Sequence, residues 1–204
     1  MTLLPLIALL AVPNPAQHTI VFLGDSLTAG YGLTRQEAFP SLVEARMRAA
    51  GLTWKVVNAG VSGDTSAGAR ARLDFVYRAK PDLLFLCIGS NDGLRGLPVA
   101  ELERNLRAIL DRARNSGTRV VLAGAMLPEN YGQAYRDAFR GLFPRLAKEY
   151  RVAFLPFILE GVAMAPGLVQ EDGIHPNAEG TRRVAASVWK VLEPELLKVK
   201  PAAR

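Results

Sequence analysis

Short apolar runs alternate with amphipathic stretches along almost the whole chain. Each apolar run is rich in Val, Ile, Leu or Phe and is followed at once by Gly, Asn, Ser or Pro. This pattern is typical of parallel strands, because helices cover both of their faces and leave no polar side. Strands are predicted on this ground at residues 19–23, 55–57, 82–88, 119–123 and 152–157.

The stretches between these runs have the periodicity of helices. Apolar residues recur three and four positions apart, which places them on one face of a helix. The clearest stretches lie at residues 39–47, 102–113, 135–146 and 184–192. Alternating strands and helices predict one α/β domain of three layers, with a parallel sheet of about five strands and helices on both faces. The pattern leaves the order of the strands open.

Polar residues gather where the predicted strands end. In an open α/β sheet the active site lies beyond the carboxyl ends of the strands. The segments at these positions are residues 24–32, 58–65, 89–96, 126–132 and 159–175. The chemistry of the protein is therefore expected in these segments.

His175 is the candidate general base. The only other histidine, His18, precedes the first predicted strand and so lies at the amino end of the sheet. Asp172 stands three positions before His175 and can accept a hydrogen bond from its Nδ1–H, which fixes the tautomer of the imidazole. The alternative is a surface histidine at the start of a helix, with Asp172 merely solvated.

Ser26 is the candidate nucleophile. It follows the first predicted strand, after Gly24 and Asp25, and Gly24 permits a tight turn. The backbone N–H of Ser26 would point into the site from the start of the next helix, where it can hold a negatively charged oxygen. The alternative is that Asp25 and Ser26 only cap a helix, which is a common use of these residue types.

Two further turns offer hydrogen-bond donors for an oxyanion. Gly60, after the second strand, can present a bare backbone N–H, and Asn91, after the third strand, has a neutral side-chain amide. Fixed neutral donors are what a tetrahedral oxyanion requires. Gly, Ser, Asn and Asp are also ordinary turn residues, so each segment taken alone has a structural alternative.

Taken together and in order, these segments resemble those of the GDSL or SGNH hydrolases. Gly-Asp-Ser-Leu begins at Gly24, the Gly60 segment follows, Gly-Ser-Asn-Asp begins at Gly89, and Asp-Gly-Ile-His-Pro begins at Asp172. Any one of these blocks is a weak signal. The whole set in this order is a strong one.

The resemblance covers residues 19–197 and is closest to a bacterial branch of thioesterases, lysophospholipases and arylesterases. Residues 91–96 and 127–132 match that branch well beyond the catalytic blocks. The resemblance implies a flavodoxin-like fold and a lipolytic or related hydrolase that uses no metal and no cofactor.

The same resemblance implies a role for each candidate residue. Ser26 is the nucleophile, and its own N–H is one oxyanion donor. Gly60 and Asn91 are the other two donors. Asp172 and His175 complete a catalytic triad.

The expected substrate is a small acyl ester or thioester. Residues 157–168 are more apolar than an exposed loop should be, and core packing accounts for part of this character. The rest could line an acyl-chain groove, with Leu94, Leu127 and Met164 as candidate substrate-binding residues. The leaving group (an alcohol, a phenol, a thiol or a glycerophospho group) and the preferred chain length stay open.

Two other functions fit much of the same sequence. A carbohydrate O-acetylesterase would share the catalytic residues and favour a shallow, polar site. A noncatalytic binding module could share the fold, since a fold does not determine a function. A pure binder, however, has no reason to place Asp172 and His175 opposite Ser26. An α/β-hydrolase of the Gly-x-Ser-x-Gly type is excluded, because the chain lacks that pentapeptide.

Composition limits the partners and cofactors. With 204 residues, 50% of them hydrophobic, the chain can bury one substantial core. The formal net charge is +6, but the arginines are scattered and match no nucleic-acid motif. We therefore expect no nucleic-acid partner, and association with a membrane surface is the alternative to a merely solvated basic surface. The single cysteine, Cys87, excludes an intramolecular disulfide, and one Cys with two His argues against a zinc site.

Residues 1–17 form an apolar N-terminal segment, interpreted as a signal, before a hydrolase domain at residues 18–204. The apolar run at residues 2–12 is shorter than the about 20 residues that span a bilayer. It resembles the apolar region of a secretory signal, with Ala16 at the cleavage position, although no Lys or Arg precedes it. A periplasmic or secreted protein, monomeric or a small homo-oligomer, is expected; a cytoplasmic protein with an uncleaved N-terminus is the alternative.

Overall fold

The computed structural model describes residues 18–199 and contains one five-stranded parallel sheet. The strands are β1 (His18–Gly24), β2 (Trp54–Gly60), β3 (Leu83–Cys87), β4 (Arg119–Ala123) and β5 (Ala153–Leu155). Every predicted strand is therefore confirmed, although β2 is longer and β5 shorter than expected. The strand order is β2-β1-β3-β4-β5, which is the flavodoxin-like order. The apolar segment at residues 1–17 lies outside the described residues.

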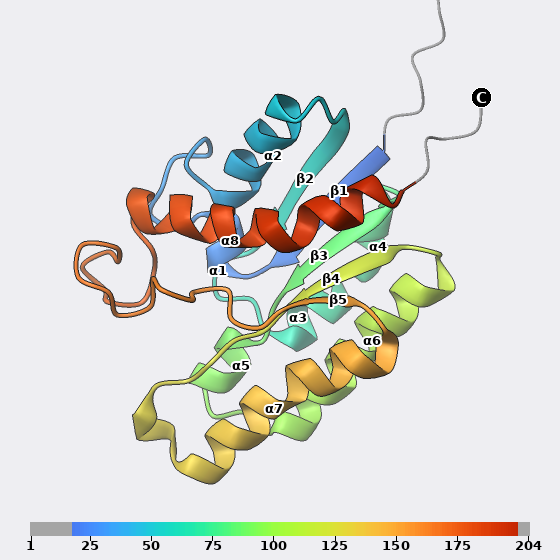
Figure 1. The fold of residues 1–204 in the computed structure, drawn as a ribbon. Helices are drawn as coiled ribbons and strands as arrows, with labels where there is room; N and C mark the ends of the chain where they lie inside the picture. The colour runs from blue at the N-terminus through green and yellow to red at the C-terminus, as the bar shows by residue number, and fades with distance from the viewer. Residues whose placement is uncertain (1–17, 200–204) are drawn as a thin grey trace, which may run out of the picture.

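Two layers of helices cover the sheet (Figure 1). Helices α2 (Phe39–Ala49) and α8 (Ala178–Leu197) pack together on one face. The opposite face is covered by α6 (Val99–Asn115) and α7 (Gln133–Tyr150), together with α3 (Ser66–Ala71) and α4 (Leu73–Tyr77). The predicted three-layer α/β domain is thereby confirmed.

Short helical segments lie at the carboxyl edge of the sheet. They are α1 (Ser26–Ala29), α5 (Ser90–Leu94) and the 3-10 helix η1 (Glu129–Tyr131). Such segments are too short to show helical periodicity in a sequence, so the hydrophobic pattern predicts only turns there. The same reason explains why the pattern does not predict α3 and α4.

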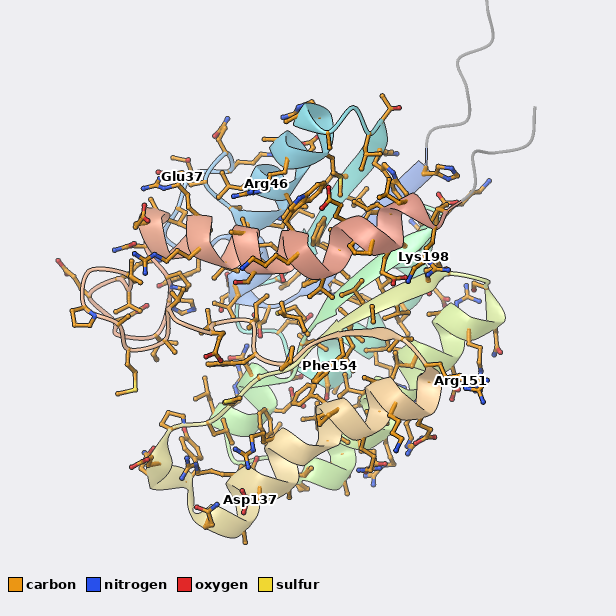
Figure 2. The ribbon with its side chains drawn as sticks, viewed as in Figure 1. Glu37, Arg46, Asp137, Arg151, Phe154 and Lys198 are labelled. Carbon is orange, nitrogen blue, oxygen red and sulfur yellow. The ribbon has the colours of Figure 1, made fainter. Side chains whose placement is uncertain are left out.

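The side chains of the central strands alternate between two buried clusters. Phe22 and Phe85 point toward α2 and α8 and pack with Phe39, and the centroids of the Phe22 and Phe85 rings lie 5.4 Å apart. Leu23, Leu84 and Leu86 of the same strands point the other way, toward α6 and α7. In Figure 2 the labelled Phe154 lies between the sheet and α7, whereas the labelled Arg46 lies on the outer side of α2. Every residue of β3 is buried, as expected for a strand between two helical layers.

The strand order places a topological switch point at β1. This strand pairs with β2 on one side and with β3 on the other, and Gly24 is level with Gly60 and with Cys87. The chain leaves β1 toward β2 and then crosses back to β3, so the connections diverge at the carboxyl end of β1. Ligands of open α/β sheets bind at such a point. The turn that carries Ser26 begins there.

The packing of the central strands predicts a large loss of stability in Phe85→Ala. Phe85 is fully buried between Phe22 and Phe39, and deleting such a side chain costs about 3–5 kcal/mol of unfolding free energy. Phe75→Ala is the matched control, because Phe75 is 68% exposed on α4. The control should cost less than about 1 kcal/mol. Urea denaturation measures both values, and equal costs for the two variants would contradict this description of the core.

Candidate active site

Ser26 is the first residue of α1, and Asp25 caps this helix. Asp25 Oδ1 accepts a hydrogen bond from the N–H of Leu27 at 3.1 Å, so the cap does not use the Ser26 side chain. The N–H of Ser26 makes no hydrogen bond within residues 18–199. Gly30, with φ of 81°, ends the helix after one turn. Ser26 therefore has both its hydroxyl and its backbone N–H available to a ligand.

The structure brings Ser26, His175 and Asp172 together. Ser26 Oγ lies 2.8 Å from His175 Nε2, and His175 Nδ1 lies 2.6 Å from Asp172 Oδ2. Because an ionised carboxylate can only accept hydrogen bonds, we assign the imidazole hydrogen to Nδ1. His175 Nε2 is then left to accept the hydrogen bond that the Ser26 hydroxyl donates.

Backbone N–H groups keep Asp172 ionised. Its Oδ1 accepts hydrogen bonds from the N–H of His175 and from the N–H of Ile174, each at 2.9 Å. These two bonds, followed by the bond from the His175 ring, lower the pKa of Asp172 to about 2. The carboxylate is therefore charged at neutral pH, which is what stabilising an imidazolium requires.

Side-chain amides fix the loop that carries His175. Gln170 Nε2 donates to the carbonyl oxygens of Tyr31 and Pro176, at 2.8 and 2.9 Å. Asn177 caps α8 through its Oδ1, and its Nδ2 donates back to the loop before it. The Tyr31 ring packs against the His175 ring, with centroids 4.6 Å apart. The imidazole is thus held by its neighbours on several sides.

Asn91 reaches the same edge of the sheet from α5. Its Nδ2 donates one hydrogen to the carbonyl oxygen of Asp64 at 2.9 Å. An amide nitrogen has two such hydrogens, so the second is left for a ligand. The next residue, Asp92, is buried and accepts hydrogen bonds from the N–H and the hydroxyl of Ser66, at 2.8 and 2.5 Å. The turn that carries Asn91 is therefore tied to the loop after β2.

The N–H of Gly60 is already engaged, contrary to the expectation from the sequence. It donates to Asn58 Oδ1 at 2.9 Å. Gly60 instead allows close packing, because a Cβ there would lie 2.2 Å from the backbone nitrogen of Ala29. Gly63 lies in the same turn with φ of 77°, and its N–H makes no hydrogen bond within the described part of the chain. The sequence shows both glycines, but only the hydrogen bond to Asn58 in the structure shows that the N–H of Gly60 is occupied.

A small pocket lies beside Ser26 and His175. It encloses a volume of about 10 Å³, roughly the room of one water molecule. Its wall is mainly apolar and includes Leu27, Tyr31, Leu33, Phe39, Leu159 and Val184. Leu27, Tyr31 and Leu159 fall in segments that the sequence analysis placed at the strand ends. Leu33, Phe39 and Val184 do not, because the hydrophobic pattern does not relate their helices and loops to Ser26.

The candidate substrate-binding residues lie outside this pocket. Leu127 is buried near Gly93, in the cluster on the α6 and α7 side of the sheet. Leu94 is partly buried against the same cluster, and its carbonyl oxygen accepts a hydrogen bond from the Tyr131 hydroxyl at 2.8 Å. Met164 is 81% exposed, so it forms no wall beside the nucleophile. Leu94 and Leu127 thus belong to the same hydrophobic cluster, whereas Met164 does not contribute to it.

Asp25 is a buried carboxyl to which the sequence analysis assigned only a capping role. It is 1% exposed, and its Oδ2 has no hydrogen-bond partner among residues 18–199. Burial raises its pKa to about 6, against the opposing effects of the Leu27 N–H and of His175. The carboxylate is therefore ionised at neutral pH although it is buried.

A parallel α/β sheet with a serine, a histidine and an aspartate joined at its switch point has the arrangement of a serine hydrolase. Within residues 18–199, no three His, Cys, Asp or Glu side chains gather in a way that could hold a metal ion. The chain belongs to the GDSL-like lipase/acylhydrolase family, whose profile matches residues 22–183.

The relatives of this chain are ester and thioester hydrolases. It is 40% identical over 188 residues to the esterase TesA of Pseudomonas aeruginosa, across 92% of this chain and 94% of that one. It is 38% identical over 189 residues to an Escherichia coli K12 enzyme named thioesterase 1/protease 1/lysophospholipase L1, across 92% and 89% of the two chains. The psychrotrophic esterase EstA from Pseudoalteromonas sp., in a structure inhibited by monoethylphosphonate, shares the fold with a TM-score of 0.84 and 30% identity, over 89% and 100% of the chains. The chain is therefore an enzyme, a serine esterase of this family.

The buried Asp25 predicts a pH dependence of stability. Its pKa rises from 3.8 to about 6 on folding, so the folded state retains a proton that the unfolded state releases, and stability falls as the pH rises through this interval. Asp25→Asn keeps an acceptor for the helix cap and should lack this fall. Relative to the wild type, the variant should gain on the order of 2–3 kcal/mol of unfolding free energy between about pH 4 and about pH 7. Urea denaturation at the two pH values measures this, and parallel pH profiles would contradict it.

Proposed function

We propose that the protein hydrolyses carboxylic esters and thioesters through an acyl-enzyme on Ser26. The observation that carries this proposal is the chain of short contacts from Ser26 Oγ through the His175 ring to Asp172, at 2.8 and 2.6 Å. A serine hydroxyl is a weak nucleophile until a base within hydrogen-bond reach activates it. The rival interpretation, a binding module of the same fold, has no use for this chain of contacts.

In the first half-reaction, Ser26 Oγ attacks the acyl carbon while His175 Nε2 takes the hydroxyl proton. The imidazolium, stabilised by the ionised Asp172, then gives that proton to the leaving alcohol or thiol. In the second half-reaction a water molecule gives a proton to His175 and attacks the acyl carbon of the acyl-enzyme. His175 then returns this proton to Ser26 Oγ as the bond from Oγ to the acyl carbon breaks, which releases the acid and regenerates Ser26. Each half-reaction passes through a tetrahedral intermediate with a negatively charged oxygen.

Three donors are proposed for this oxygen: the Ser26 N–H, the second Asn91 Nδ2 hydrogen and the Gly63 N–H, which replaces that of Gly60. The N–H groups of Ser26 and Gly63 have no other partner within residues 18–199, whereas that of Gly60 is bound to a side chain. Gly63 also precedes Asp64, whose carbonyl oxygen holds the Asn91 amide. Donors fixed before the substrate arrives need no rearrangement in the transition state.

The proposed acyl chain lies on the α5 side of the site. The pocket beside Ser26 has room for about one water molecule, so a chain of several carbons must lie outside it. Leu94, which is only partly buried, supplies apolar surface on that side, with the buried Leu127 behind it in the same cluster. The relatives named esterase and thioesterase support either an oxygen or a sulfur leaving group. The small pocket itself favours the rival, a carbohydrate O-acetylesterase, because an acetyl group is the acyl group that needs least room.

Association of the rim of the site with lipid-like surfaces is a further part of the proposal. Loops at this edge expose the large apolar side chains of Tyr31, Val61, Met126, Met164 and Ile174. Among residues 18–199, no helix has the length and apolar character needed to cross a membrane. Export to the periplasm or outside the cell through residues 1–17, and a monomer or small homo-oligomer, are likewise proposed from the sequence.

Replacing the nucleophile tests the mechanism. Ser26→Ala should fold like the wild type, lose at least about 10⁴-fold in kcat and lose all labelling by a fluorophosphonate, because no other hydroxyl among residues 18–199 contacts His175 Nε2. Ser62→Ala is the matched control, since Ser62 is an exposed serine of the neighbouring loop, and it should keep both activity and labelling. Turnover by a folded Ser26→Ala protein would rule out the serine mechanism.

Chain-length dependence distinguishes the two substrate classes. If the acyl chain packs on Leu94, each buried methylene should raise kcat/KM roughly fourfold from acetyl toward hexanoyl p-nitrophenyl esters, below the micelle concentration. Leu94→Trp should penalise hexanoyl esters more than acetyl esters. The same change at Met164 shows whether the chain also reaches the loop at residues 157–168. A flat or falling series in the wild type would decide for the O-acetylesterase.

A further inference from the structure

We propose that Arg72 and Asp64 form a positioning pair that holds the oxyanion donors in place. The inference rests on the proposed serine-esterase mechanism and adds to it an arginine that contacts none of the three triad side chains. Arg72 lies at the junction of α3 and α4. Its side chain is 21% exposed and that of Asp64 is 10% exposed, so both are largely covered by protein.

Arg72 joins two turns at the carboxyl edge of the sheet. Its Nε donates to Asp64 Oδ2 at 2.8 Å, and its Nη2 donates to the carbonyl oxygen of Gly24 at 3.2 Å. Gly24 is the last residue of β1 and stands two positions before Ser26. The same carbonyl oxygen accepts the N–H of Val61 at 3.0 Å. The guanidinium therefore adds a second tie between the turn of the nucleophile and the loop after β2.

The pair reaches Asn91 through the backbone of Asp64. The carbonyl oxygen of Asp64 accepts one hydrogen of Asn91 Nδ2, so its position determines where the second hydrogen points. The Asp64 N–H donates to the carbonyl oxygen of Val61 at 3.1 Å. On its other side, the Asp64 carboxylate packs so closely on Gly68 that a Cβ there would lie 1.9 Å from Oδ1. Asp64 is thus fixed through its backbone, through Arg72 and through this packing.

An arginine suits this task because of its shape. The guanidinium presents several N–H donors in a rigid plane, so one side chain can hold acceptors on two different turns. A lysine carries the same charge but no fixed fork. Because the pair is largely covered by protein, removing one partner also lowers the folding stability, so each variant is tested for folding. A small displacement of a catalytic group lowers the rate strongly, and the contacts of Arg72 with two turns of the site fit such a role in transition-state geometry.

The test is a double-mutant cycle between Arg72 and Asn91 with one p-nitrophenyl ester. Arg72→Gln should lower kcat by roughly 10- to 100-fold with KM changed by less than about twofold, because the loss falls on the transition state. Asn91→Ala should lower kcat by roughly 10²–10³-fold, the cost of one oxyanion donor. In the Asn91→Ala background, adding Arg72→Gln should cost less than about threefold more, since the donor that Arg72 positions is already gone.

Conservative and control variants separate positioning from folding. Arg72→Lys should fold like the wild type yet recover only part of kcat, because it lacks the fork. Asp64→Asn keeps an acceptor for Arg72 and should lose less than Arg72→Gln. Arg78→Gln is the matched control, since Arg78 is an exposed arginine at the end of α4 that stacks on Phe75, and its kcat should stay within about twofold of the wild type. Urea denaturation of each variant verifies the fold.

Two results would overturn the positioning role. One is a wild-type kcat in Arg72→Gln, and the other is a double variant whose loss is the product of the two single losses. If Arg72→Gln does not fold, Arg72→Lys and Asp64→Asn enter the same cycle with Asn91→Ala. Failure of the proposed function looks different, because Ser26→Ala would then keep turnover, or the wild type and Arg78→Gln would both lack it.

Discussion

Parallel hydrogen bonding of β1 to β2 and to β3 is the constraint on which the site depends. It puts the ends of these three strands at one level, so the turns that follow them begin side by side. Ser26 and Asn91 both follow these strand ends directly, so short side chains are enough to bring them to one site there. His175 arrives from beyond β5, at the far edge of the sheet, and cannot rely on that register. Its loop depends instead on the Gln170 and Asn177 amides, which tie it to the turn after α1 and to α8.

Two carboxylates beside the same imidazole differ in environment and therefore in effect. Asp172 is exposed, accepts two backbone N–H bonds and holds its charge down to a pKa of about 2. Asp25 is buried, has one oxygen without a partner in the described part of the chain, and has its pKa raised to about 6. Of the two carboxylates, only Asp172 touches the ring and sets its tautomer. The buried Asp25 carboxylate destabilises the fold, as strained or charged groups at active sites commonly do.

The hydrophobic pattern predicted the five buried strands and the four long helices. It could do so because a short apolar run and an apolar residue every three or four positions are local features of the sequence. The residues that meet at the strand ends could also be predicted, because the rule about carboxyl edges needs no coordinates. The sequence could not show which of two neighbouring glycines has a backbone N–H that is free to donate to a ligand. Gly60 and Gly63 are the same residue type in one turn, and the bond from Asn58 that occupies Gly60 depends on a side-chain direction. Met164 is an apolar residue, yet its side chain is exposed. The apolar character of a loop residue does not determine whether its side chain packs against the protein or faces solvent.

The small size of the pocket beside Ser26 bears on where the substrate specificity resides. Its wall includes Phe39 and Val184 of the core between α2, α8 and the sheet, so enlarging it would disturb packing that stabilises the fold. The turns after β3 and β4 lie outside this wall and are joined to each other by the bond from the Tyr131 hydroxyl to the carbonyl oxygen of Leu94. If the acyl chain lies on these turns, as proposed, substitutions there change the acyl site without touching Ser26 or His175. Specificity would then reside in loops, whereas the chemistry resides in residues that the sheet and its helices position.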